Sequence, residues 1–260
     1  MYFNAAMQIL TPEEYLIMAN KDQILGLLKE YYADRYNIDN IPIHLHAHYY
    51  KCGLLYLPDR VTKQCKSTVA IDCGAWVGDT AIMLNDYGFS EIHCFEPHPT
   101  TVETLKTNLR ANKNNGNFRI HHKAVGNTCS TLMMADEGYL GGGSKITDSG
   151  SIPVETVTLD SFWKSTKRVG LLKLDVEGFE ENVLEGAIKL IKRDKPILLI
   201  AVYHEDASPG QMIRVQQFIN DLKLGYKFIF RGMQPDYGMI YEYDLICYID
   251  NEVTKDISKK

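Results

Sequence analysis

The chain has 260 residues, 45% of them hydrophobic and 23% charged, which is enough for one α/β domain with an extension. Its formal net charge of −5 argues against nucleic acid as a partner, because phosphate backbones attract basic surfaces. The sequence shows no signal peptide, no membrane-spanning run and no Cys-x-x-Cys spacing among its six cysteines, so we expect a cytoplasmic protein with reduced thiols.

Three segments are predicted along the chain. Residues 1–60 form a helical N-terminal extension or lid, residues 61–252 the cofactor-binding domain, and residues 253–260 a basic tail. A hydroxyl cap at Thr11 begins a helix in which apolar residues recur at helical spacing as far as Tyr32.

Histidine and tyrosine are frequent between residues 41 and 56. If this stretch is a strand, His44, His46 and His48 share one face and could hold a metal ion. The alternatives are a half-buried aromatic patch and a surface that faces the substrate.

A short apolar strand that breaks at a glycine and enters a helix is predicted in the stretch Val69-Ala70-Ile71-Asp72-Cys73-Gly74-Ala75-Trp76-Val77-Gly78-Asp79-Thr80. The two glycines are interpreted as positions where the backbone approaches a ligand. The first amides of a helix carry partial positive charge, so this turn can hold a carboxylate or phosphate. A second apolar run ends at Glu96, 24 residues after Asp72, where an acid can accept both hydroxyls of a ribose.

The glycine spacing separates two cofactors that contain adenosine. A nicotinamide dinucleotide usually requires Gly-x-Gly-x-x-Gly, with small residues throughout the turn. Here the glycines are Gly74 and Gly78, and Cys73 and Trp76 occupy positions where a dinucleotide loop prefers small residues. The pattern therefore favours S-adenosyl-L-methionine, with a nicotinamide-dependent oxidoreductase and an ordinary strand–turn–helix as alternatives.

Strands and helices alternate through the rest of the chain, which predicts a mostly parallel sheet with right-handed crossovers. The predicted helices span residues 79–87 (closed by Gly88), 100 or 101 to 111, 180–192 and 210–222, and the predicted strands span residues 91–95, 118–125, 132–135, 154–159, 170–178, 197–202, 226–230 and 245–249. Because no helix separates the last two strands, we expect an antiparallel edge. The glycines at 141–143 form either a surface loop or a loop that folds over the cofactor and brings Ser144 near it.

Charged residues alternate in the polar end of the strand predicted over residues 170–178. Lys173, Asp175 and Glu177 would project from one face at the carboxyl end of a central strand, where open α/β sheets bind ligands. Burying such charges unpaired is costly, so we expect them to pair with each other or to contact a ligand. His204 follows the next strand and joins them as a candidate.

These motifs together resemble one family. The chain is similar to the FkbM-type S-adenosylmethionine-dependent methyltransferases over roughly Val61 to Ile249. The resemblance lies in Val69-Ala70-Ile71-Asp72-Cys73-Gly74-Ala75, Phe95-Glu96-Pro97-His98-Pro99, Val157-Thr158-Leu159-Asp160, Lys173-Leu174-Asp175-Val176-Glu177-Gly178-Phe179-Glu180, Leu184-Glu185-Gly186-Ala187, Ala201-Val202-Tyr203-His204 and Gly225-Tyr226-Lys227. It implies a seven-stranded class I methyltransferase fold (Rossmann-like), S-adenosyl-L-methionine as donor, and usually a hydroxyl acceptor on a sugar, glycan or secondary metabolite.

The expected cofactor site comprises Asp72, Cys73, Gly74, Ala75, Gly78, Thr80, Glu96, Pro97, Ala124, Val125, Ser144 and Asp175. The donor methyl group is already activated, so the enzyme mainly aligns an acceptor hydroxyl and removes its proton. We expect His204 or Asp175 to be the base, with Glu177 and Lys173 orienting acceptor or cofactor.

Several alternatives stay open for these residues. Lys173 and Glu177 could form a structural ion pair. No metal is assigned, but Asp175, Glu177 and His204 could hold Mg²⁺ that acidifies the acceptor hydroxyl. The protein could also bind S-adenosylmethionine without catalysis, as a partner of another protein.

Overall fold

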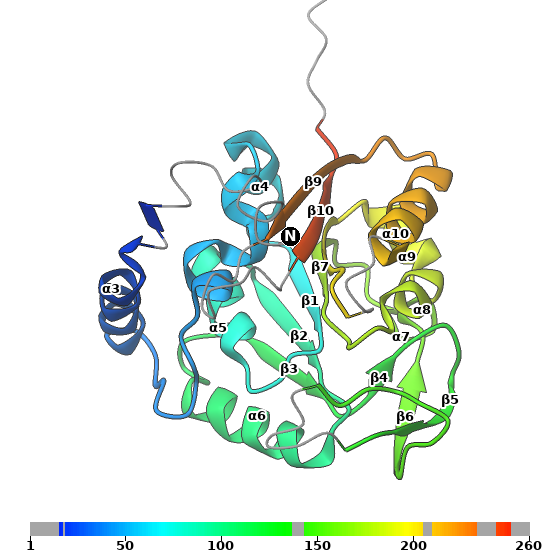
Figure 1. Ribbon diagram of the computed structural model, residues 1–260, viewed down its shortest axis with the longest axis horizontal. Helices are drawn as coiled ribbons and strands as arrows, with labels where there is room; N and C mark the ends of the chain where they lie inside the picture. The colour runs from blue at the N-terminus through cyan, green and yellow to red at the C-terminus, as the bar shows by residue number, and fades with distance from the viewer. Residues whose placement is uncertain (1–15, 18, 137–142, 205–209, 233–242, 251–260) are drawn as a thin grey trace, which may run out of the picture.

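The central sheet runs through the middle of the molecule, with helices on both of its faces (Figure 1). The structure, a computed structural model, describes residues 16–17, 19–136, 143–204, 210–232 and 243–250. Within these residues the sheet has seven strands, in the spatial order β3 (Phe118–His121), β2 (Glu91–Phe95), β1 (Val69–Cys73), β7 (Val169–Leu174), β8 (Ile197–Ala201), β10 (Tyr243–Tyr248) and β9 (Lys227–Gly232).

The first five strands in that order are parallel, and β10 is antiparallel to both β8 and β9. The predicted mostly parallel sheet with an antiparallel edge is therefore confirmed. The last strand of the chain lies one place inside the edge, between β8 and β9, so that β9 forms the edge itself.

The helices and helical turns are α3 (Lys21–Ala33), η1 (Leu45–Tyr49), η2 (Lys51–Tyr56), α4 (Asp59–Cys65), α5 (Asp79–Tyr87), α6 (Pro99–Ala111), α7 (Leu159–Phe162), α8 (Glu180–Glu185), α9 (Ile188–Asp194) and α10 (Gly210–Asp221). None of the helices among the described residues is long and apolar enough to span a membrane. The predicted helix start at Thr11 and the predicted tail at 253–260 lie outside the described residues.

Alternating side chains of the strands build a separate core on each face of the sheet. In β1, Ala70 belongs to one core, while Val69 and Ile71 belong to the other. In β7, Leu171 and Leu172 divide in the same way. All five residues of β1 are buried, as expected for a parallel strand covered by helices on both faces. Each buried aliphatic side chain of this kind contributes roughly 1.5–3 kcal/mol.

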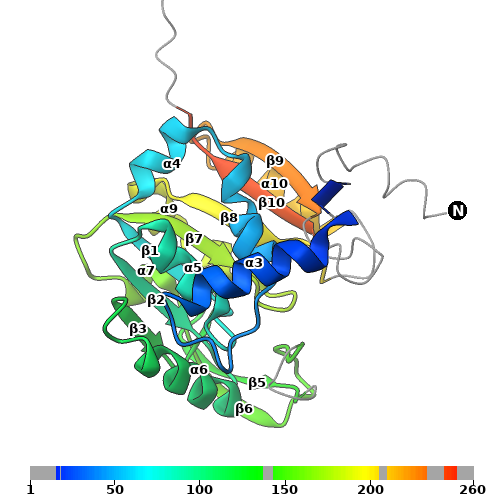
Figure 2. The same ribbon diagram turned by 90° about the vertical axis from the view of Figure 1, so that its left-hand side faces the viewer.

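Residues before the predicted boundary at residue 60 take part in one of these cores. Tyr32, Ile43 and Leu54 are buried in the same cluster as Ala70 and Leu171. Figure 2 shows α3 in front of the sheet, near α5. The division of the chain at residue 60 stays a prediction, and the first strand is already packed against residues that precede it.

A second, smaller sheet has the order β4 (Ala124–Val125), β6 (Ile152–Val157) and β5 (Ser130–Met134). The prediction of one strand over residues 118–125 is wrong, because β3 pairs with β2 while β4 pairs with β6. A turn separates them, in which the Lys123 backbone N–H donates to the His121 carbonyl oxygen at 2.9 Å.

The single helix predicted over residues 180–192 is also wrong, since α8 ends at Glu185 and α9 begins at Ile188. A Cβ atom at Gly186 would lie only 1.9 Å from the carbonyl oxygen of Gly126, so the chain there fits only a glycine. The Asp160 carboxylate then accepts the backbone N–H groups of Lys189 and Leu190, each at 2.9 Å, and caps α9.

The histidine-rich stretch does not form a strand. Leu45–Tyr49 makes a single π-helical turn, closed by the Tyr50 backbone N–H, which donates to the Leu45 carbonyl oxygen at 2.9 Å. The three histidines consequently do not share a face: His46 lies 2.7 Å from Asp244, whereas the ring of His48 packs edge-on against Tyr32.

Candidate active site

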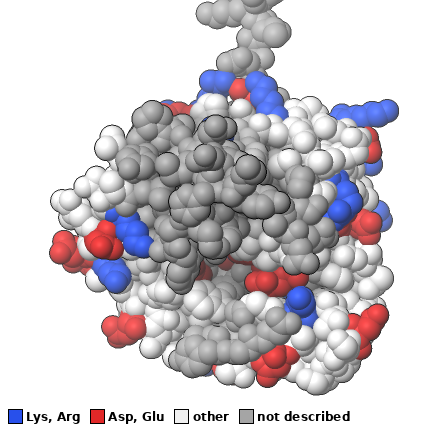
Figure 3. Space-filling view, viewed as in Figure 1, with Lys and Arg blue, Asp and Glu red and all other residues white. Residues whose placement is uncertain are grey.

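A cavity opens at the carboxyl ends of β1, β2 and β7, the edge at which open α/β sheets bind ligands. Figure 3 shows this face of the molecule hollowed, with acidic side chains beside the hollow. The predicted site residues that line the cavity are Cys73, Gly74, Thr80, Glu96, Pro97, Ala124, Val125, Ser144, Lys173, Asp175 and Glu177. The predicted residues outside the lining are Asp72, Ala75, Gly78 and His204. Residues 137–142, with most of the glycine loop predicted to fold over the cofactor, lie outside the described residues.

Glu96 lies at the end of β2, where an acid was expected to contact a ribose. Its Oε1 accepts the backbone N–H of His98 at 2.8 Å, and its Oε2 accepts that of Trp76 at 3.0 Å. Burial raises the pKa of this carboxyl to about 7. Each carboxylate oxygen has a second lone pair, so both can still accept a ligand hydroxyl.

The glycine turn is shaped by packing within the protein. Gly74 and Gly78 have φ values of +82° and +94°. A Cβ atom at Gly74 would lie 1.8 Å from the carbonyl oxygen of Asp175, and one at Gly78 would lie 3.0 Å from Leu105 Cδ1. The atoms that these glycines approach in the structure belong to Asp175, directly after β7, and to α6. Gly74 also lines the cavity, and its close approach to a ligand stays a prediction.

Several backbone amides of this turn also have acceptors inside the protein. The N–H groups of Gly74 and Ala75 donate to the Phe95 carbonyl oxygen at 3.0 and 3.1 Å, and that of Gly78 donates to the Ala75 carbonyl oxygen. With the Trp76 amide on Glu96, these bonds fix the turn to the end of β2. These amides precede α5, and the anion contact expected from the first amides of that helix stays a prediction.

Lys173 is buried at the centre of a charged network. Its Nζ lies 3.2 Å from Asp72 Oδ1 and 3.4 Å from Asp175 Oδ2, and donates to the Gly74 carbonyl oxygen at 3.2 Å. Burial raises the pKa of Asp72 to about 6, against the opposing effect of Lys173. The structural ion pair considered for Lys173 exists with Asp72 and Asp175, and not with Glu177. Asp72 is fully buried and does not line the cavity.

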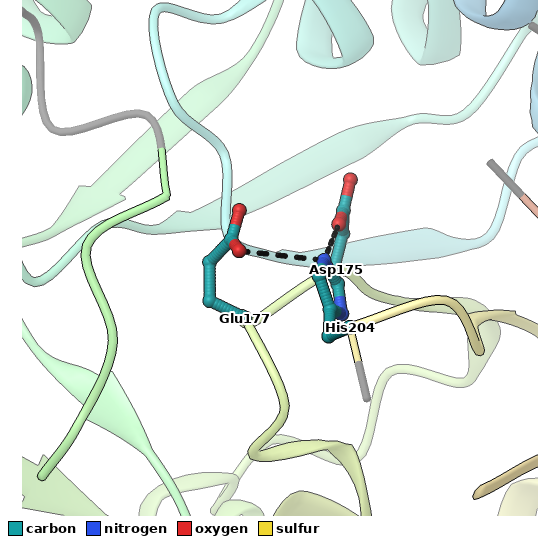
Figure 4. Close-up of side chains that lie close together, drawn as sticks. All are labelled: Asp175, Glu177 and His204. Carbon is teal, nitrogen blue, oxygen red and sulfur yellow. Dashed lines mark ion pairs between the residues drawn. The ribbon is translucent and has the colours of Figure 1, made fainter. Parts of the chain in front are cut away.

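Asp175, Glu177 and His204 come together at the polar end of the cavity (Figure 4). His204 Nε2 lies 3.4 Å from Asp175 Oδ1 and 3.6 Å from Glu177 Oε2, and Nδ1 lies 2.9 Å from Glu180 Oε1. The strand predicted over residues 170–178 is too long, because β7 ends at Leu174. Asp175 follows directly, whereas Glu177 belongs to a turn in which its φ is +56°.

The electrostatics of this cluster bear on the expected base. Although burial lowers the pKa of His204, the carboxylates of Asp175 and Glu180 raise it to about 10, so the ring is protonated at neutral pH. Burial alone would raise the pKa of Asp175, but Lys173 and His204 hold it below its usual value. A protonated imidazole cannot take up a proton, and a carboxylate of low pKa takes one up weakly.

Comparison with protein families decides the assignment. The methyltransferase FkbM domain matches residues 72–228, which include the glycine turn, Glu96 and the cluster around Asp175. The chain belongs to the FkbM methyltransferase family. Membership confirms the predicted family and supports the predicted cofactor, S-adenosyl-L-methionine.

A solved structure of another FkbM methyltransferase shares the fold of this FkbM-family chain. An FkbM methyltransferase from Methylobacillus flagellatus KT is 20% identical with a TM-score of 0.58, and the match covers 95% of this chain but only 58% of that longer one. Fibrillarin from Aeropyrum pernix, solved with natively bound S-adenosyl-L-methionine, is 15% identical (TM-score 0.47; 77% of this chain, 74% of that one). An rRNA methylase from Streptococcus thermophilus is 10% identical (TM-score 0.46; 73% and 92%). A search of the curated proteins found no match.

The FkbM-family motifs did not identify every residue of the cavity. Tyr203 lies in one of these motifs but had no predicted role, and His46 lies outside them; both line the cavity. His46 Nε2 lies 2.7 Å from Asp244 Oδ2 on β10. The many histidines between residues 41 and 56 suggested a surface that faces the substrate as one alternative, but no pattern distinguished His46 from His44 and His48. Met134 and Ile146 also line the cavity, and no sequence pattern indicated that the small sheet would reach it.

Proposed function

We propose that this protein transfers the methyl group of S-adenosyl-L-methionine to a hydroxyl oxygen of a small-molecule or glycan acceptor, such as a sugar or a secondary metabolite. The observation that carries the proposal is that one cavity is lined both by Glu96 and by the acidic pair Asp175 and Glu177. The glycine turn, at Gly74, lines the same cavity.

Glu96 suits the nucleoside of the donor. Its carboxylate can accept the ribose hydroxyls, and Cys73, Pro97 and Val125 supply apolar surface in the same cavity. Asp175 and Glu177 suit a polyhydroxylated acceptor, since carboxylate oxygens accept hydrogen bonds from hydroxyl groups. Tyr203 donates its hydroxyl to Asp175 Oδ1 at 3.1 Å and keeps that carboxylate oriented.

The reaction needs alignment more than activation. The acceptor oxygen forms a bond to the methyl carbon while the carbon–sulfur bond breaks and its electrons return to sulfur. The products are a methyl ether, S-adenosylhomocysteine and the proton of the hydroxyl group. Asp175, Glu177 and His204 are the residues that we expect to orient the acceptor and assist the departure of its proton.

Donor binding is tested by thermal unfolding with two ligands. We expect S-adenosylhomocysteine to raise the melting temperature, because a ligand at 100 times its Kd stabilises the folded state by about 2.7 kcal/mol. NAD should leave the melting temperature unchanged. Stabilisation by NAD alone would favour the oxidoreductase alternative and contradict the proposal.

Acceptor chemistry is tested with radiolabelled S-adenosylmethionine and fractionated small-molecule and glycan extracts. Label should enter a hydroxylated acceptor as a methyl ether, and the variant His204→Ala should lose turnover while it still binds S-adenosylhomocysteine. Glu181→Gln, on an exposed part of α8, is the matched control and should behave as the unchanged protein. Label on nitrogen or sulfur, or donor binding without transfer to any fraction, would contradict the proposal.

A further inference from the structure

Three side chains at the ends of adjacent strands point toward one another (Figure 4). Asp175 and Glu177 follow β7, and His204 follows β8. One ligand atom from each lies within 4.8 Å of the other two, with Nε2 of His204 3.4 Å and 3.6 Å from the two carboxylates. Two ligands at right angles, each about 2.1–2.5 Å from a cation, lie about 3.0–3.5 Å apart. From this geometry we propose that Asp175, Glu177 and His204 bind a divalent cation.

The orientation of His204 is an independent reason for a cation. Its side chain is only 6% exposed, and within the described part of the chain its Nε2 makes no hydrogen bond of good geometry, although it is aimed between two carboxylates. The opposite ring nitrogen faces Glu180 Oε1 at 2.9 Å. Histidines that ligate metals commonly donate their other N–H to a carboxylate, which fixes the ring and leaves the first nitrogen for the metal.

Hydrogen bonds to both of its oxygens fix the position of the Glu180 carboxylate. It is fully buried, its Oε1 accepts the Val176 backbone N–H at 3.0 Å, and its Oε2 accepts the side-chain amide of Gln211 at 2.6 Å. Glu180 is therefore a fixed negative charge 2.9 Å from Nδ1 of His204, although this contact, like those of Nε2, lacks good hydrogen-bond geometry.

Charge balance favours a cation at the same point. Four acidic side chains contact two basic ones here: Asp72 and Asp175 lie against Lys173, and Asp175, Glu177 and Glu180 lie against His204. Lys173 contacts Asp72 and the Oδ2 atom of Asp175, which leaves Asp175 Oδ1 to face His204. Burying surplus negative charge is costly. A proton on His204 offsets part of this charge, and a divalent cation that replaces the proton would offset more.

Two carboxylates and one imidazole form a mixed oxygen and nitrogen ligand set. Such a set suits a hard cation such as Mg²⁺ or Mn²⁺, which completes its coordination with water or with substrate oxygen. The role of the cation in catalysis rests on the proposed function. There it would bind the acceptor hydroxyl and lower its pKa, so that the proton leaves to water as the oxygen attacks the methyl carbon.

Mn²⁺ binding to the full chain tests the site without donor or acceptor. We expect calorimetry to show one Mn²⁺ bound per chain. The variant Glu177→Gln should bind Mn²⁺ at least about tenfold more weakly than the unchanged protein, and Glu180→Gln about 10- to 100-fold more weakly. Glu181→Gln is the matched control, because this residue is adjacent to Glu180 but pairs with Arg214 at the surface. Melting curves establish that each variant is folded.

Electron paramagnetic resonance gives a direct readout in the unchanged protein. We expect coupling of bound Mn²⁺ to an imidazole nitrogen, lost in His204→Gln. Absence of saturable binding at millimolar Mn²⁺, absence of nitrogen coupling, or equal affinities in Glu177→Gln and Glu181→Gln would overturn the metal site. Because these measurements involve no methyl transfer, their failure is distinct from failure of the proposed function, which could proceed in the presence of a chelator.

Discussion

Glu96 has both carboxylate oxygens bonded to backbone N–H groups, yet burial raises its pKa to about 7. The carboxyl is therefore mostly neutral at pH 6 and mostly charged at pH 8. A charged carboxylate accepts hydroxyl hydrogen bonds more strongly than a neutral one. We predict that S-adenosylhomocysteine binds up to about tenfold more tightly at pH 8 than at pH 6, as calorimetry would measure.

The variant Glu96→Gln separates this effect from titration of the ligand. It cannot ionise, so its affinity at pH 8 should be low and the contribution of Glu96 to the pH dependence should vanish. Glu103→Gln, an exposed position on α6, should retain the wild-type pattern. Identical pH profiles for wild type and Glu96→Gln would remove Glu96 from the ribose contact.

The glycine turn after β1 packs against the end of β7 where Gly74 meets the backbone of Asp175. A Cβ atom at Gly74 would lie 1.8 Å from the Asp175 carbonyl oxygen, and its φ is +82°. Gly225 has nearly the same φ, +80°, with nothing near its Cβ position. We predict that Gly225→Ala lowers the free energy of unfolding by only about 1–2 kcal/mol, the cost of placing a residue with a Cβ atom in the left-handed conformation. Gly74→Ala should cost well beyond that and weaken donor binding.

Urea unfolding of both variants measures the difference, with the donor affinity of each measured separately. Because the two alanines share the same backbone strain, any excess in Gly74→Ala reports the collision with Asp175. Equal free energies of unfolding for the two variants would mean that the turn can move away from β7 at no cost.

Elements were predictable from sequence where local residues decide them. Gly88 ends α5 in a left-handed conformation, and His98 with Pro99 begins α6, so these boundaries were found within a residue or two. The separation of β3 from β4 depends on pairing with β6, and the gap between α8 and α9 depends on Gly126 and Asp160. Such partners are distant in the chain, and no local pattern indicates them.

The same limit applies to the site in the molecule as a whole. Cys73, Glu96 and Asp175 were predictable because they end parallel strands of one sheet, and those ends meet at one edge. His46 precedes that sheet in the chain and reaches the cavity through a π-helical turn tied to Asp244 near the other terminus. Only the folded chain brings these two residues together.

Two neighbouring tyrosines on α3 differ in how they contact the rest of the molecule. Tyr32 on α3 is fully buried, its ring packs edge-on with His48, and its hydroxyl accepts a hydrogen bond from Lys51 Nζ at 2.6 Å. Tyr31 beside it is 40% exposed and donates its hydroxyl to Asp86.

We predict one cooperative unfolding transition for the whole chain, because Tyr32 belongs to the same core cluster as strands of the central sheet. Tyr32→Ala should then lower the free energy of unfolding by about 3–5 kcal/mol, the usual cost of removing a buried aromatic ring. Tyr31→Ala, the matched control, should cost under about 1 kcal/mol. Calorimetry that shows an unchanged main transition in Tyr32→Ala, preceded by a separate small one, would mean instead that residues 1–60 unfold as an extension independent of the sheet.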